Sequence, residues 1–159
     1  MSGLLRRLAL ISALAGCACA CLVALLTVAS IAGRSLWSRP IPGDVELSQF
    51  GIALCIALCL PWCQLQRANI IVDFFTQKMA PRPRGLLDAV GALLLALMVG
   101  LLAWRTMVGA LSVREAGEAT MILDLPMWIS YAALGPGLAL TALIALAQVL
   151  PHLRGEPAA

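Results

Sequence analysis

Residues 61–79, PWCQLQRANIIVDFFTQKM, separate two pairs of long apolar segments near the middle of the chain. Within this stretch the apolar side chains fall on one arc of a helical projection, and the polar side chains of Asp73, Thr76 and Gln77 fall opposite. This pattern predicts a short amphipathic helix over residues 69–79 that lies on a membrane surface. Such a helix can rest in lipid or brace a partner subunit, and amphipathicity favours neither.

The composition is that of an integral membrane protein. The 159 residues are 62% hydrophobic and 12% charged, with a mean hydropathy of +0.96, whereas a soluble domain is about half apolar and a quarter charged. A spanning helix needs about 20 apolar residues, so the length has room for about four spans and short connections. The formal net charge of +3 does not imply nucleic acid, because the location of Lys and Arg matters more in a membrane protein than their sum.

The apolar segments predict an all-α membrane fold with four transmembrane helices, arranged as two hairpins on either side of the interfacial helix. We expect spans over residues 8–32, 45–65, 86–108 and 125–150, in a single membrane domain covering 1–159. Arg6 and Arg7 precede an apolar run that ends in Leu14-Ala15-Gly16-Cys17, which resembles a lipoprotein cleavage site. We favour an uncleaved first helix, because no charge follows until Arg34.

Small residues recur every four positions in three of the spans and predict faces for close helix packing. These sets are Ala9, Ala13, Cys17 and Cys21, then Gly51, Cys55 and Cys59, and then Ala92, Ala96 and Gly100. Asp44 is placed to cap the second helix, and Glu46 falls in its first turn, where the helix dipole favours a carboxylate. Within the fourth span, Gly135-Pro136-Gly137 predicts a kink rather than an unwound binding site.

The basic residues predict an orientation with both termini in the cytoplasm. In this orientation the inner side holds Arg6, Arg7, Arg67, Lys78, Arg82, Arg84 and Arg154. The outer side holds fewer basic residues: Arg34, Arg39, Arg105 and Arg114. The four tryptophans, Trp37, Trp62, Trp104 and Trp128, fall at predicted span ends, as an aromatic belt requires.

Residues that could carry chemistry are scarce. No predicted span has a charge near its centre, where a carrier binds its ion or substrate. Arg105 lies close enough to a span end to reach the interface, where Glu46, Glu115 or Asp124 could pair with it. No catalytic arrangement is present, so we expect no enzyme, no cofactor and no metal site.

The six cysteines lack CxxC spacing and have no His or carboxylate companions, so we interpret them as packing residues. Two alternatives remain open. The chain could be a membrane thiol oxidoreductase that uses the clustered cysteines, or a self-sufficient small carrier.

Three short motifs on this four-span chain carry a resemblance to a known family. They are PGDVE at residues 42–46, QRANIIVD at residues 66–73 and LDLPMWISY at residues 123–131. Their order and spacing resemble the small membrane subunit of tripartite ATP-independent periplasmic (TRAP) transporters, the DctQ-like family, over residues 6–149. Asn69 stands where many members have His, whereas Asp73 matches the acidic position of the family.

The resemblance implies a symport complex in which a large permease subunit carries sodium and an organic acid delivered by a periplasmic solute-binding protein. The small subunit would brace the large one and help to dock the binding protein, with membrane lipid as its other neighbour. The candidate partner-contact residues are Glu46, Asn69, Asp73, Arg105, Arg114, Glu115, Glu118 and Asp124. The helix over 69–79 would then be a brace at the inner interface, with Asp73 near Arg67 or Arg84.

Overall fold

Four long helices make up the fold, and all four are long and apolar enough to cross a membrane. The structure, a computed structural model, describes residues 3–38, 41–66 and 81–153. Its helices are α1 (Gly3–Trp37), α2 (Asp44–Leu65), α4 (Pro81–Ala116) and α5 (Trp128–Leu153). The described residues form no strand beyond one isolated bridge, between Ala119 and Pro126. The all-α, four-span prediction is confirmed, while the predicted interfacial helix over 69–79 lies outside the described residues.

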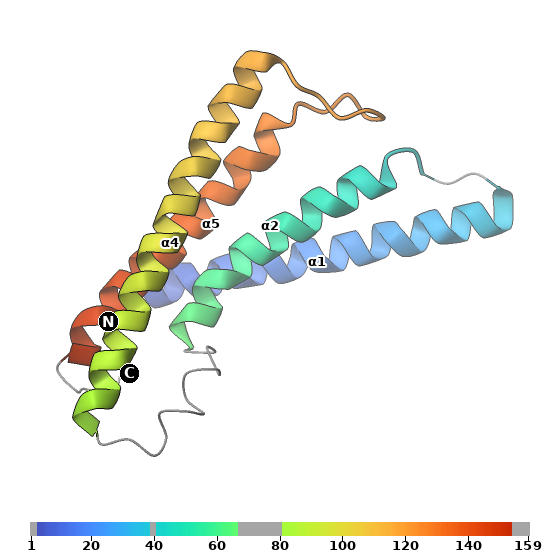
Figure 1. The fold of residues 1–159 in the computed structure, drawn as a ribbon. Coiled ribbons are helices and arrows are strands. Elements are labelled where there is room, and N and C mark those ends of the chain that lie inside the picture. Colours follow the sequence, from blue (N-terminus) through green and yellow to red (C-terminus); the bar gives the residue numbers. More distant parts are fainter. Residues whose placement is uncertain (1–2, 39–40, 67–80, 154–159) are drawn as a thin grey trace.

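The helices form two antiparallel hairpins, α1 with α2 and α4 with α5 (Figure 1). Contact between the hairpins is made mainly by α2 against α5. The hairpins lie close together where α2 and α5 end and diverge toward their turns (Figure 1). We call the side with the two hairpin turns the loop end, and the opposite side the terminal end.

The helix bounds differ from the bounds of the predicted spans, most of all in α1 and α4. α1 continues to Trp37 rather than 32, and α4 continues to Ala116 rather than 108. The predicted connection over 109–123 is therefore helical in its first half, and Trp104 lies inside a helix rather than at its end. The fourth helix begins at Trp128, three residues later than predicted. At 1.5 Å per residue, the 35 residues of α1 measure about 52 Å, longer than the roughly 30 Å hydrocarbon core of a bilayer.

The core consists mostly of small side chains. The buried apolar residues are Ala9, Ala13, Ala57, Ala89, Ala92, Ala96, Ala103, Ala110, Ala142, Ile144 and Ala145. Large apolar side chains lie on the exposed surface of every helix, as expected of a chain surrounded by lipid or by partner helices. Backbones therefore approach closely: a Cβ at Gly16 of α1 would lie 2.7 Å from the Cys59 Sγ of α2.

The predicted small-residue faces of α2 and α4 lie at helix contacts. Gly51 packs against Val23 of α1, and Gly100 faces Ala142 of α5. On α1, Ala9 and Ala13 of the predicted face are buried and the Cys17 thiol lies beside Cys59 of α2, whereas Cys21 is exposed. Four residues rotate about 40° beyond one full helical turn, so positions spaced by four drift off the buried side of the helix. After Ala13, the buried residues of α1 are Gly16 and Ser30.

Candidate partner interface at the loop end

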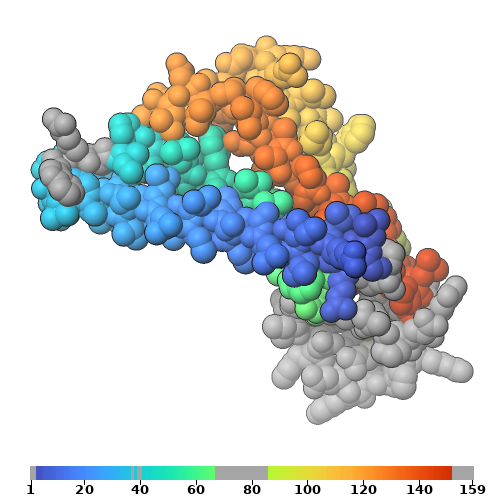
Figure 2. All heavy atoms as spheres, turned by 180° about the vertical axis from the view of Figure 1, so that it is seen from behind, coloured from blue at the N-terminus to red at the C-terminus, as the bar shows by residue number. Residues whose placement is uncertain are grey.

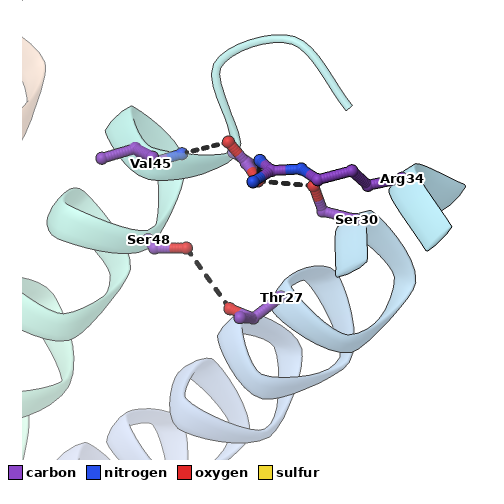
Figure 3. Close-up of polar contacts among 6 residues, drawn as sticks. Thr27, Ser30, Arg34, Val45 and Ser48 are labelled. Carbon is purple, nitrogen blue, oxygen red and sulfur yellow. Dashed lines mark hydrogen bonds and ion pairs between the residues drawn. The ribbon is translucent and has the colours of Figure 1, made fainter. Parts of the chain in front are cut away.

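The turn between α1 and α2 is closed by polar contacts around Asp44 (Figure 3). Asp44 Oδ1 accepts a hydrogen bond from the Val45 backbone N–H at 2.8 Å, and Oδ2 accepts one from Ser30 Oγ at 2.5 Å. The guanidinium of Arg34 lies 4.0 Å from the same carboxylate. Asp44 was predicted as the helix cap, but Gly43 occupies that position, with φ of 75°. Asp44 is the first helical residue and ties the start of α2 to the end of α1.

The loop between α4 and α5 has a well-defined backbone. At the end of α4, the Gly117 N–H donates to the Arg114 carbonyl and the Glu118 N–H donates to the Val113 carbonyl. With Gly117 at φ of 67°, this is a Schellman motif, which explains why the helix ends at Ala116. The loop then folds back on itself, because the Thr120 N–H donates to the Leu125 carbonyl and Thr120 Oγ1 accepts from the Leu125 N–H.

Glu46 joins this loop to α2. Its Oε1 accepts a hydrogen bond from the Ile122 N–H at 3.1 Å, and its Oε2 accepts one from the Leu123 N–H at 3.3 Å. The Thr120 side chain also hydrogen-bonds to this carboxylate. Beside it, Leu123 packs on Gly43 so closely that a Cβ at this glycine would overlap the leucine side chain. The two hairpins are therefore connected at the loop end by a carboxylate and by an apolar contact.

The other predicted site residues at this end are exposed. The Arg114 guanidinium lies 5.2 Å from the centre of the Trp128 ring, a cation–π contact between the end of α4 and the start of α5. Glu115, Glu118 and Asp124 are exposed, and Asp124 adopts φ of 56°. The structure thus brings five of the predicted contact residues to one end: Glu46, Arg114, Glu115, Glu118 and Asp124.

Of the other three predicted contact residues, the structure describes only Arg105. Arg105 is exposed on α4, and within the described residues it pairs with none of its expected carboxylate partners. Glu46 instead binds backbone N–H groups of the loop. Asn69 and Asp73 fall in the segment that the structure does not describe, as does the expected proximity of Asp73 to Arg67.

Near the terminal end, two buried amides connect the hairpins. Gln64 Nε2 donates to Gln148 Oε1 at 2.7 Å, and Gln148 Nε2 donates to the Gln64 carbonyl at 3.0 Å. Both residues are buried. Sequence reasoning missed this pair, although an amide side chain inside an apolar span is itself a signal of an interhelical hydrogen bond.

Gly135-Pro136-Gly137 lies inside α5, which is helical on both sides of it, so this segment is not an unwound site. Its glycines permit close packing instead: Gly135 faces Met107 of α4, and Gly137 faces the Ala57 carbonyl of α2. The Thr141 hydroxyl donates to the Gly137 carbonyl at 2.8 Å. The expected kink at Pro136 stays a prediction, because the helix bounds alone do not give a bend.

No group of side chains suited to a metal ion occurs in the described ranges 3–38, 41–66 and 81–153. All six cysteines are free, and Cys59 donates weakly to the Ala13 carbonyl across the contact between α1 and α2. The polar groups at the loop end are hydrogen-bonded within the chain or exposed. This arrangement suits contact with another protein.

Comparison with known proteins identifies the family. Residues 23–155 match the model of the family described as "Tripartite ATP-independent periplasmic transporters, DctQ component". No curated protein and no solved structure gave a significant match. Because the match covers most of a chain with four membrane-length helices, the chain belongs to the DctQ family: it is the small membrane component of a TRAP transporter and not an enzyme.

Proposed function

We propose that this subunit lies in the bacterial inner membrane with both termini in the cytoplasm, braces the large permease subunit and helps to dock the solute-binding protein. The complex would take up an organic acid together with sodium. A TRAP small subunit works with a large permease and a solute-binding protein. The bracing role, the docking role, the coupling ion and the solute are the proposed parts.

The observation that carries the bracing role is the distribution of polar and apolar side chains over the helices. In the described part of α5, no Asp, Glu, Lys or Arg occurs, and in α2 both charged residues lie in the first turn. Carriers place ionisable groups in mid-membrane to bind ions or substrate. Meanwhile α1 packs mainly against α2 and exposes large apolar side chains from Leu4 to Leu36. A helix partner is thus favoured over independent transport.

The bracing role is tested by co-purification with the large membrane protein expressed from the same operon. We expect a stable complex in detergent, and vesicles that contain the small subunit alone should show no solute flux. Purification of this chain as a lone, monodisperse species under all conditions would contradict the role. Flux through the small subunit alone would favour a self-sufficient carrier instead.

The docking role is supported by the exposed charges at the loop end. Glu115 and Glu118 are exposed, so their reversal to Lys leaves the described polar contacts of the loop intact. We expect Glu115→Lys and Glu118→Lys to weaken uptake without loss of the membrane complex. Arg114→Glu is less clean, because it also removes the contact with Trp128. The matched control is Gln66→Glu, a charge change at an exposed residue of the terminal end.

Uptake that is unchanged in both glutamate variants would remove these positions from the docking surface. The coupling ion and the solute are tested separately in vesicles that contain the whole complex and the binding protein. We expect accumulation of a labelled organic acid to require an inward sodium gradient. Accumulation that is independent of sodium would refute the proposed coupling while leaving the bracing role intact.

A further inference from the structure

The two hairpins are held together at two separated places. Toward the middle of both helices, α2 and α5 touch through Ala57 and Gly137, and nearer the terminal end they touch through Gln64 and Gln148. At the loop end, Glu46 and Gly43 contact the α4–α5 loop. Between these places the hairpins diverge, and Figure 2 shows the surface hollowed between α2 and the first half of α5.

These two places differ in what holds them. The α2–α5 contact is a backbone approach: a Cβ at Gly137 would fall 2.3 Å from the Ala57 carbonyl oxygen. Close packing of this kind does not open without separating whole helices. The loop contact depends on the hydrogen bonds of one carboxylate and on the packing of Leu123, at a partly exposed site. It is therefore the weaker and more easily opened of the two.

The α4–α5 loop is also held rigidly on both of its helices. The Schellman motif at Gly117 and the two hydrogen bonds between Thr120 and Leu125, one of which the Thr120 hydroxyl accepts, fix its shape relative to α4. The cation–π contact of Arg114 with Trp128 fixes it relative to α5. A loop of defined shape cannot absorb a movement of α2 in the way that a flexible connection would.

From this arrangement we propose that the α4–α5 loop is a latch. Glu46 holds the loop on the first turn of α2 and thereby sets the angle at which the two hairpins diverge from their contact at Ala57 and Gly137. Release of the carboxylate lets the loop end open while the terminal end stays closed. The latch is a property of this chain alone and does not depend on the proposed docking role.

The test measures distances between spin labels on the full-length chain in nanodiscs, by pulsed electron paramagnetic resonance. The native cysteines are first replaced by Ala, except that Cys63 is kept in the pair that labels it. One pair, at Val45 and Ile129, reports on the loop end, because both residues are exposed at the first turns of α2 and α5. A second pair, at Cys63 and Leu150, reports on the terminal end and is also exposed.

We expect Glu46→Ala to lengthen and broaden the distance distribution between positions 45 and 129, and Glu46→Gln, which keeps one oxygen acceptor, to do so less. The distribution between positions 63 and 150 should not change in either variant. Glu118→Ala is the matched control, because it removes an exposed carboxylate from the same loop. No hydrogen bond joins this carboxylate to α2 in the described structure. Glu118→Ala should leave both distributions unchanged.

Two results would overturn the latch. An unchanged distribution between positions 45 and 129 in Glu46→Ala would show that the carboxylate does not set the angle. A change at both pairs would show that the hairpins have come apart as a whole. As an independent check on the loop side, Leu123→Ala removes the packing on Gly43. Because the Glu46 hydrogen bonds remain, it should broaden the distribution between positions 45 and 129 less than Glu46→Ala does. An equal or larger effect would show that Leu123, and not the carboxylate, holds the loop.

Discussion

Adding one methyl group at Gly137 should weaken the contact between the two hairpins. A Cβ at this position would lie 2.3 Å from the carbonyl oxygen of Ala57 and 2.7 Å from its carbonyl carbon. The obstacle is the backbone of α2, which cannot rotate aside like a flexible side chain. Because an ordinary contact between such atoms is at least 3.4 Å, α2 and α5 must separate by about 1 Å in Gly137→Ala.

The cost follows from overpacking and helix propensity. Overpacking of a close contact costs about 1–3 kcal/mol, and replacing a helical Gly by Ala returns roughly 0.5–1 kcal/mol. The net loss is therefore about 0–2.5 kcal/mol, which corresponds to a fall in Tm of up to roughly 10 °C for a chain of this size. A separation of this size also lengthens the hydrogen bond between Gln64 and Gln148, now 2.7 Å, so we expect the upper part of this range.

The assay measures Tm of the purified chain in one detergent. Size-exclusion chromatography of heated samples monitors the loss of folded protein. Gly91→Ala is the matched control, because a Cβ at Gly91 in α4 meets no atom within 4 Å. This variant should be as stable as the native chain or slightly more stable. Gly137→Leu should lower Tm further than Gly137→Ala. If Gly137→Ala is as stable as Gly91→Ala, the close approach of α2 and α5 does not exist in the membrane protein.

Three further variants test other contacts. Gln148→Leu removes both hydrogen bonds to Gln64 and should cost about 1 kcal/mol, measured as a lower Tm; no change would place this amide outside the interface. Cys59→Leu overfills the contact with α1 and should cost about 1–3 kcal/mol, whereas Cys21→Leu, at an exposed position of α1, should be neutral; equal effects would refute this packing. Arg105→Ala should change stability by less than about 0.5 kcal/mol, and a larger loss would show that Arg105 has a partner.

Hydropathy predicted the number of helices and their pairing, because the cost of leaving backbone groups unpaired in lipid allows few alternatives to a helix. It predicted the helix ends less well. Apolar character falls after Val108, but α4 continues to Ala116, where Gly117 supplies the left-handed conformation that ends it. That local signal lies in the sequence, and hydropathy does not detect it.

The contacts between hairpins could not be predicted in this way. Glu46 and Ile122 are 76 positions apart, and no local pattern records that they meet. The role of Gly137 was equally hidden, since a Gly-Pro-Gly segment fits a kink, an unwound site or a close approach. The contact of Gly137 with the Ala57 backbone of α2 shows that the segment serves a close approach of two helices. On α1, the four-residue spacing holds as far as Cys17 beside Cys59 but not at Cys21, because the helix turns in 3.6 residues.

Because the core is rich in alanine, we expect the fold to tolerate a loss of side-chain volume better than a gain. Among the described residues, the buried apolar side chains are alanines apart from Ile144 and Pro61, and an alanine has almost no side-chain volume to lose. Substitutions that create cavities, a common route to loss of stability in soluble proteins, are thus largely closed to this chain. Substitutions that add volume at the same positions force helices apart. Sequence change should therefore accumulate on those outer faces that meet lipid, where large apolar residues exchange freely, and the spacing between the helices should change little.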